Sequence, residues 1–278
     1  MPEGPEIRRA AQAVHRGIAG QPVRMTLAHP VLAAMERALR GATVEAVSAR
    51  SKAMLTRFST GDVLYSHNQL YGEWVVDRPD EPLRSRAIRL VLETSAQRAV
   101  LYSATDFAWL RHGEEDAHPY IAKLGPEVLG DATTVRDIAA RLAQFPRRRI
   151  ADALLDQQVL AGLGNYLRSE ITFVAKLNPW RRLGELSDAE RHKLAKAVHD
   201  ITHRSFRTDG VCVPNALYRA QRRLGASFEA ARFFVFDRAQ QPCRECSATI
   251  ERATLGGRKL FVCIACQGVF PLPDELRH

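Results

Sequence analysis

Long apolar runs are missing from this chain. No stretch approaches the length needed to span a bilayer, and the first residues lack the apolar core of a secretory signal because charge begins at Glu3. We also find no internal repeat and no low-complexity segment. We therefore expect a cytoplasmic protein with no membrane partner, and its 278 residues suggest two domains or one domain with an appendage.

Lysine is scarce. Only six lysines stand among 40 basic residues, so the other 34 are arginine. A genome biased towards arginine would produce this excess on its own. A lysine can nevertheless release its proton at a workable pH whereas an arginine cannot, which makes each lysine, Lys52 among them, a candidate for chemistry. The net charge of +9 favours a polyanionic partner.

Cysteine is also sparse, yet four of the five cysteines are regularly spaced. They form the pattern Cys243-x2-Cys246-x16-Cys263-x2-Cys266, while Cys212 stands alone as a packed or idle thiol. In a cytosolic protein this spacing predicts one structural zinc ion held by four thiolates, and a redox role for the two pairs is less favoured. Inside the pattern, Gly256-Gly257 separates two alternating segments and predicts a hairpin turn.

The chain begins Met1-Pro2-Glu3-Gly4-Pro5-Glu6. Removal of Met1 would leave Pro2 with a free secondary amine, whose pKa near ~7.7–8.0 is well below the ~10.4 of a lysine. Much of that amine would be a neutral nucleophile, and its attack on an aldehyde carbon gives a cationic iminium. Glu3 and Glu6 supply carboxylates for proton transfer beside it. The alternative is an ordinary first helical turn, where proline and glutamate are common.

Two further segments carry weaker signals. Gly162-Leu163-Gly164-Asn165 is a glycine-rich turn between apolar segments, and Asn165 is placed to cap the next helix, whose free N–H groups suit a phosphate. Gln69-Leu70-Tyr71 lies between two strand-like runs and could place an apolar wedge in a duplex. Each has a plainer alternative: the first can be a pair of helix caps, and the second can be core.

The apolar periodicity changes along the chain. A helical period over residues 4–18 is followed by alternating segments at 53–59, 63–67, 74–77, 88–93 and 99–102, which predict an antiparallel β-sandwich packed against that helix. After a linker at 113–130, helical patterns return at 134–144, 149–157, 165–175 and 187–206, the last with a capping box at Ser187–Glu190. We expect a partly mobile loop over residues 207–232. The predicted fold class is α+β with several domains.

Taken in order, these features resemble one family. The N-terminal hexapeptide, Lys52, the turn at residues 162–166 and the four spaced cysteines are similar to those of the formamidopyrimidine-DNA glycosylase/endonuclease VIII family. The resemblance runs from residue 2 to about residue 267, and residues 6–11, 64–72 and 154–157 look most like bacterial endonuclease VIII. It implies a catalytic β-sandwich domain with flanking helices over 1–125, a helix–two-turn–helix DNA-binding domain over 126–232, and a zinc-binding β-hairpin module with a tail over 233–278.

The resemblance also implies a role for each matched residue. Pro2 would attack C1′ of a damaged nucleotide, Glu3 would assist departure of the base, and Lys52 would donate a proton during β-elimination. Arg258 would hold a phosphate and assist δ-elimination. The residues expected to contact DNA are Gln69, Leu70, Tyr71, Lys123 and Asn165. Lys123 stands where the endonuclease VIII pattern has an arginine, so a bidentate clamp would be lost there.

The implied function is a bifunctional DNA glycosylase and AP lyase of base excision repair that removes oxidised pyrimidines by β,δ-elimination. Its partner would be double-stranded DNA with damaged bases or abasic sites, bound by a monomer that is cytoplasmic and, in a bacterium, associated with the nucleoid. Two alternatives stay open: an oxidised-purine glycosylase of the 8-oxoguanine type, and a non-catalytic zinc-containing DNA-binding protein. Residues 211–232 form a longer stretch than the family pattern, which leaves the lesion open, and the tail after residue 267 has no assigned function.

Overall fold

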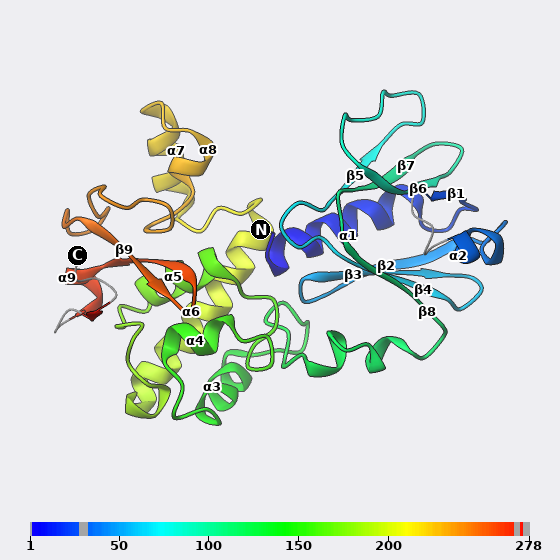
Figure 1. Cartoon of the computed structure of the whole chain (residues 1–278). Helices are drawn as coiled ribbons and strands as arrows, with labels where there is room; N and C mark the ends of the chain where they lie inside the picture. The colour runs from blue at the N-terminus through cyan, green and yellow to red at the C-terminus, as the bar shows by residue number, and fades with distance from the viewer. Residues whose placement is uncertain (1, 28–32, 270–272, 275–278) are drawn as a thin grey trace. The chain divides into compact units, whose positions relative to one another are not determined.

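The computed structural model describes residues 2–27, 33–269 and 273–274. The chain divides into two compact units, Met1–Lys123 and Leu124–His278, and Figure 1 labels most of the helices and strands of each. Within the described ranges, no helix has the length and apolar character that crossing a membrane requires. Each unit builds a hydrophobic core of its own.

The first unit opens with helix α1 (Gly4–Ile18), as the apolar period over residues 4–18 predicts. Ile7, Val14 and Ile18 recur at helical spacing and are buried. Glu3 and Glu6 form a capping box in which the backbone N–H of Glu3 donates to Glu6 Oε2 at 3.0 Å. This box fixes where the helix begins, so Pro2 is held directly before its first turn.

Two antiparallel four-stranded sheets form the sandwich that the alternating segments predict, and Figure 1 shows them with α1. One sheet has the order β1-β6-β7-β5 and the other β2-β3-β4-β8. The strands are β1 (Arg24–Leu27), β2 (Val44–Arg50), β3 (Ala53–Phe58), β4 (Val63–His67), β5 (Glu73–Asp77), β6 (Ile88–Glu93), β7 (Arg98–Tyr102) and β8 (Asp106–Leu110). The alternating pattern misses β1, β2, β8 and the short helix α2 (Ala33–Ala38).

The core of the first unit lies between α1 and the two sheets. Val14, Val47 and Leu101 belong to one buried cluster, which joins the helix to both sheets. On β3 and β4, Leu55 and Tyr65 pack in a second cluster with Ile121 of the short 3-10 helix η3 (Ile121–Lys123). This second cluster anchors strand β3, which begins directly after Lys52, and the helical turn that ends at Lys123.

Most of the regular secondary structure of the second unit is helical. Its first four α-helices are α3 (Val135–Ala143), α4 (Ile150–Leu155), α5 (Asn165–Val174) and α6 (Asp188–Arg207). The four helical patterns of the sequence are thereby confirmed, and Ser187 and Glu190 form the expected capping box of α6. Every residue of α5 from Tyr166 to Phe173 is buried. This helix therefore lies at the centre of the unit, with polar side chains inside as well as apolar ones.

The prediction of a partly mobile loop over residues 207–232 is wrong. Helix α7 (Asn215–Arg223) and the short helix α8 (Phe228–Ala231) occupy most of that stretch. No residue of α7 is buried, and asparagine, glutamine and arginine make up more than half of the helix. Leu217 and Tyr218 are partly buried against a neighbouring apolar cluster that includes Val213.

A hairpin of β9 (Ile250–Leu255) and β10 (Arg258–Cys263) follows, and α9 (Ile264–Gln267) comes after it. Gly256 and Gly257 form the two-residue turn with φ values of 59° and 72°, as the Gly-Gly signal predicts. Strand β10 packs on α5, where the Phe261 N–H donates to Ser169 Oγ at 3.3 Å. Arg258 thus stands directly after the turn. Most of the tail beyond residue 269 lies outside the described residues.

Candidate active site and cysteine cluster

Pro2 and Glu3 lie at the start of α1 in the first unit. Glu3 is only 3% exposed, and its side chain faces the backbone N–H of Glu6 in the capping box. Glu6 also pairs with Arg9 at 3.3 Å. The carboxylate of Glu3 is therefore held next to Pro2 by the first helical turn. Met1 lies outside the described residues, so its removal stays a prediction.

A hollow of about 460 Å³ opens beside Pro2. Ile7 and Trp74 give it apolar walls, and its rim includes Leu70, Tyr71 and Arg86. The structure therefore brings the predicted nucleophile and two of the three residues of the predicted wedge to one site. They are far apart in sequence, and the strand order of the sandwich places them together.

The wedge residues belong to a tight turn between β4 and β5, residues 68–72, which we name the tip. Gly72 N donates to Asn68 O at 2.7 Å, and a Cβ on Gly72 would come within 2.6 Å of that oxygen, so the turn needs glycine. Leu70 and Tyr71 are 54% and 71% exposed. This exposure excludes the alternative that they are core residues.

Gln69 is fixed at the base of the tip. Its φ is 48°, in the left-handed region. Its backbone N–H donates to His67 Nδ1 at 3.0 Å, and its side-chain amide donates to Asp106 Oδ2 at 3.4 Å. Burial lowers the pKa of His67; the charge of Asp106 opposes this shift, and the charge of Lys52 adds to it. A neutral His67 can accept the bond from Gln69, which supports a structural role for this histidine.

Lys52 lies in the two-residue turn between β2 and β3. The preceding residue, Ser51, has a φ of 60°, and the pairing of Arg50 with Ala53 closes the hairpin. The hydroxyl of Tyr120 accepts from Lys52 N at 3.4 Å and donates to Ser51 Oγ at 3.2 Å. The backbone at Lys52 is therefore supported from the segment that leads to Lys123, which is exposed at the end of η3.

In the second unit, Asn165 is not the helix cap that the sequence suggests. Gly164 takes the cap position, and Asn165 is the first residue of α5. Its side-chain oxygen accepts a hydrogen bond from Arg168 at 2.8 Å. The same nitrogen of Arg168 donates to Lys259 O at 2.8 Å and lies 3.4 Å from Arg258 O. Arg168 therefore contacts both the side chain of Asn165 and the backbone at Arg258 and Lys259, so one side chain positions both predicted phosphate-binding residues.

Sequence reasoning missed Arg168, and it also missed Glu170. Glu170 is fully buried, and its carboxylate accepts three backbone N–H bonds, from Phe234 at 2.7 Å, Val235 at 2.8 Å and Phe236 at 2.9 Å. Burial raises its pKa, and the three N–H groups oppose that shift. Glu170 thus connects α5 through hydrogen bonds to residues 234–236, which precede the hairpin of β9 and β10.

The four spaced cysteines meet at one point. Their sulfur atoms all lie within 4.8 Å of one another, with Cys243 and Cys266 3.9 Å apart and Cys246 and Cys263 3.4 Å apart. Four thiolates around a zinc ion with Zn–S bonds of about 2.3 Å have sulfurs about 3.8 Å apart, so the cluster fits a tetrahedral metal ion. Cys212 is buried apart from them in the helical core.

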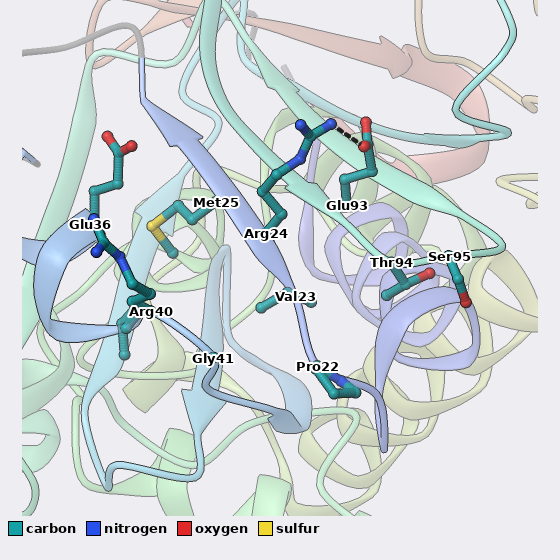
Figure 2. A pocket seen from close by; sticks show the side chains of 11 residues that line it. Pro22, Val23, Arg24, Met25, Glu36, Arg40, Gly41, Glu93, Thr94 and Ser95 are labelled. Carbon is teal, nitrogen blue, oxygen red and sulfur yellow. Dashed lines mark hydrogen bonds and ion pairs between the residues drawn. The ribbon is translucent and has the colours of Figure 1, made fainter.

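A second hollow, of about 490 Å³, lies elsewhere in the first unit. Figure 2 shows its lining from β1, α2 and the end of β6, with the ion pair of Arg24 and Glu93 on its rim. None of the predicted site residues lines it. The hollow beside Pro2, although slightly smaller, is therefore the candidate active site.

Two family models match most of the chain. The formamidopyrimidine-DNA glycosylase N-terminal domain matches residues 1–106, and the formamidopyrimidine-DNA glycosylase H2TH domain matches residues 124–215. Endonuclease 8 of Klebsiella pneumoniae is 42% identical over 271 residues, which cover 96% of this chain and 100% of that protein. Endonuclease 8 of Escherichia coli has the same identity and coverage.

Solved structures agree on the fold. Formamidopyrimidine-DNA glycosylase of Lactococcus lactis, bound non-covalently to DNA with an AP site, matches with a TM-score of 0.78 at 20% identity and covers 95% of this chain and 99% of that one. MutM in complex with DNA containing carbocyclic 8-oxo-G matches with a TM-score of 0.79 at 21% identity and covers 96% and 99%. The predicted arrangement of a sandwich, a helical domain and a cysteine-bearing hairpin is thereby confirmed.

Proposed function

Because this chain belongs to the formamidopyrimidine-DNA glycosylase/endonuclease VIII family, whose members are DNA glycosylases with AP lyase activity, we propose that it excises oxidised pyrimidines through a Schiff base on Pro2. The chain is a repair enzyme of the base excision type. The proposal adds the lesion class, the nucleophile and the β,δ-elimination. The observation that carries it is the position of Pro2 on the same hollow as Leu70 and Tyr71.

The proposed reaction begins with the amine of Pro2. Its lone pair forms a bond to C1′ of the damaged nucleotide, the N-glycosidic bond breaks, and the base leaves with a proton. Ring opening gives a positively charged iminium between Pro2 and C1′, which is an electron sink. Loss of a proton from C2′ then expels the 3′ phosphate, and a second elimination expels the 5′ phosphate. One amine therefore serves both the glycosylase and the lyase steps.

Two side chains would move protons in this scheme. Glu3 is held beside Pro2 by the capping box and would assist the departure of the base. Lys52 is presented by a hairpin turn whose backbone is fixed by Tyr120, and it would donate a proton during β-elimination. Neither role needs a cofactor.

The target base must leave the duplex before Pro2 can reach C1′. Extrusion costs a few kcal/mol of stacking and pairing, and apolar side chains that fill the vacated space offset part of that cost. Leu70 and Tyr71 are apolar, exposed and held on a fixed turn, as this task requires. Gln69, at the base of the tip, would add a third side chain to the contact with the duplex at the vacated space.

The second unit would bind phosphates. Arg168 is hydrogen-bonded to the side chain of Asn165 and to the backbone next to Arg258, so it positions both residues. Arg258 would also assist the second elimination. Lys123 would add a phosphate contact from the first unit. One zinc ion held by the four cysteines would stabilise the hairpin that carries Arg258 and would take no part in the chemistry.

Borohydride trapping on a panel of duplexes tests this function. The panel holds thymine glycol, 8-oxoguanine, a preformed abasic site or no lesion in one sequence context. We expect trapping and β,δ-cleavage with thymine glycol and with the abasic site. Faster reaction with 8-oxoguanine than with thymine glycol would overturn the lesion class. Binding to every duplex without trapping would support the non-catalytic alternative.

A further inference from the structure

The tip is held at both ends by side chains that the proposed chemistry does not use. At its start, Gln69 is bonded to His67 and Asp106. At its end, the backbone carbonyl of Tyr71 accepts a hydrogen bond from Arg86 Nη2. Between these two points the backbone closes on itself through the bond from Gly72 to Asn68. The side chains of Leu70 and Tyr71 point outward from a backbone that is fixed on both sides.

Arg86 is held in its place by Glu73, the first residue of β5. The other terminal nitrogen of Arg86 donates to Glu73 Oε2. The guanidinium also lies 5.9 Å from the ring centre of buried Tyr102 on β7. A planar guanidinium can donate in two directions at once, which a lysine cannot do with fixed geometry. Arg86 therefore connects the edge of the sheet to the tip.

We propose that Arg86, oriented by Glu73, is a positioning residue that sets the tip in its inserting conformation before DNA is bound. The inference rests on the proposed function, because it concerns the same void-filling step. A loop that must be ordered during binding loses conformational entropy at that moment, and a loop that is already fixed avoids this cost. The bond from Arg86 to the Tyr71 carbonyl fixes the exposed half of the tip, where the turn has little packing of its own.

Arg84 provides a matched control within the same cluster. Its Nη1 donates to Glu73 Oε1 at 3.1 Å, so Arg84 and Arg86 bind the two oxygens of one carboxylate. The Arg84 backbone N–H donates to Tyr102 Oη at 3.2 Å, and a side-chain substitution leaves that bond in place. In the described residues only Arg86 of this pair bonds to the Tyr71 carbonyl. The variants Arg84→Gln and Arg86→Gln thus remove the same charge and differ in their effect on the tip.

The test compares cleavage of one abasic strand as a duplex and as a single strand. A single strand has no vacated space to fill, so only the duplex reaction needs the tip. We expect Arg86→Gln to lower the ratio of kcat/KM for duplex over single strand about tenfold, the size of a lost charged hydrogen bond. Arg84→Gln should change that ratio by less than about twofold, as expected for an exposed ion pair.

A second readout follows insertion itself. A fluorescent 2-aminopurine placed opposite the abasic site reports unstacking when the tip enters, and its fast phase should slow in Arg86→Gln and stay unchanged in Arg84→Gln. Equal loss on both DNA forms, or equal behaviour of the two variants, would overturn the positioning role. Failure of the proposed function would look different: the unmodified enzyme would not excise thymine glycol, or its borohydride adduct would not lie on Pro2, whereas the comparison of the two variants on abasic duplex and single strand would not change.

Discussion

The side-chain oxygen of Asn165 accepts a hydrogen bond of 2.8 Å from the guanidinium of Arg168. A guanidinium has only donors, so the oxygen of the amide must face Arg168 and its NH2 group must face away. The NH2 group of Asn165 is therefore free of Arg168 and oriented to donate a hydrogen bond to a phosphate oxygen. Arg168 is fully buried and also holds the backbone at Lys259, next to Arg258.

Arg168→Met should weaken DNA binding although the residue is buried. The substitution keeps an apolar stem but frees both the Asn165 amide and the hairpin backbone, so we expect an affinity loss of about tenfold, equal for abasic and lesion DNA. Fluorescence anisotropy at fixed salt measures it. In a double-mutant cycle with Asn165→Ala the two losses should overlap, and strictly additive losses would show that Arg168 does not act through Asn165.

Acid should remove part of the stability of the second unit. The side chain of Arg181 donates to Glu190 and holds the pKa of Glu190 at about 2, below its value of about 4.3 in an unfolded chain. The stabilisation is therefore present above about pH 5 and is lost as the pH falls towards 2. Both side chains are about one third exposed, which limits it to about 1 kcal/mol.

Glu190→Gln isolates that charge, because glutamine can still complete the capping box with Ser187. Urea unfolding of the two proteins should differ by about 1 kcal/mol at pH 7, and the difference should shrink steadily as the pH falls from about 5 towards 2. A difference that does not change with pH would mean that the carboxylate charge adds no stability.

Loss of the metal should weaken DNA binding without unfolding the first unit. Cys263→Ser removes one of the four sulfurs, and we expect the bound zinc to fall from one per chain towards zero. The hairpin then loses its anchor, so Arg258 is misplaced. Metal analysis and binding assays on the same sample check this. Full zinc content together with full strand cleavage in Cys263→Ser would contradict the assignment.

Glu3→Gln should separate the two activities. Glu3 is placed to help a damaged base depart, but an abasic site has no base left to remove. We expect the single-turnover rate on thymine glycol to fall about 100-fold or more, the usual size of a general acid–base contribution. The rate on a preformed abasic site should fall far less. Lys52→Ala serves as the comparison, because it should slow both substrates.

An equal loss of both rates in Glu3→Gln would mean that Glu3 is needed for Schiff-base formation in general. In that case the division of roles between Glu3 and Lys52 would be wrong, although Pro2 could still be the nucleophile.

The elements that the sequence predicts well are those with a one-sided apolar pattern. Helix α1 has such a stripe and a capping box, and its bounds agree with the prediction. Helix α7 is short, mostly polar and has no buried residue, and strand β8 is mostly half-exposed, so neither segment contains a run of residues that reads as core. The apolar pattern of the sequence does not predict an element well when that element makes few apolar contacts.

The candidate site divides in the same way. Short motifs pointed to Pro2 and to the four cysteines, whereas the scarcity of lysine and the family resemblance pointed to Lys52. Arg168 and Glu170 were missed because their partners lie about 65 to 90 residues away in sequence. In the sequence of α5 they look like ordinary polar helix residues. Because the whole helix is buried, their side chains instead form internal hydrogen bonds to distant backbone groups.

The identity of the residue joined to DNA tests the central claim most directly. After borohydride trapping on an abasic duplex, the complex is digested with trypsin and nuclease and the modified peptide is sequenced by mass spectrometry. We predict the adduct on the N-terminal peptide that begins at Pro2 and ends at Arg8, with Met1 absent. An adduct on the peptide from Ser51 to Arg57, which contains Lys52, or retained Met1 in fully active enzyme, would contradict the account.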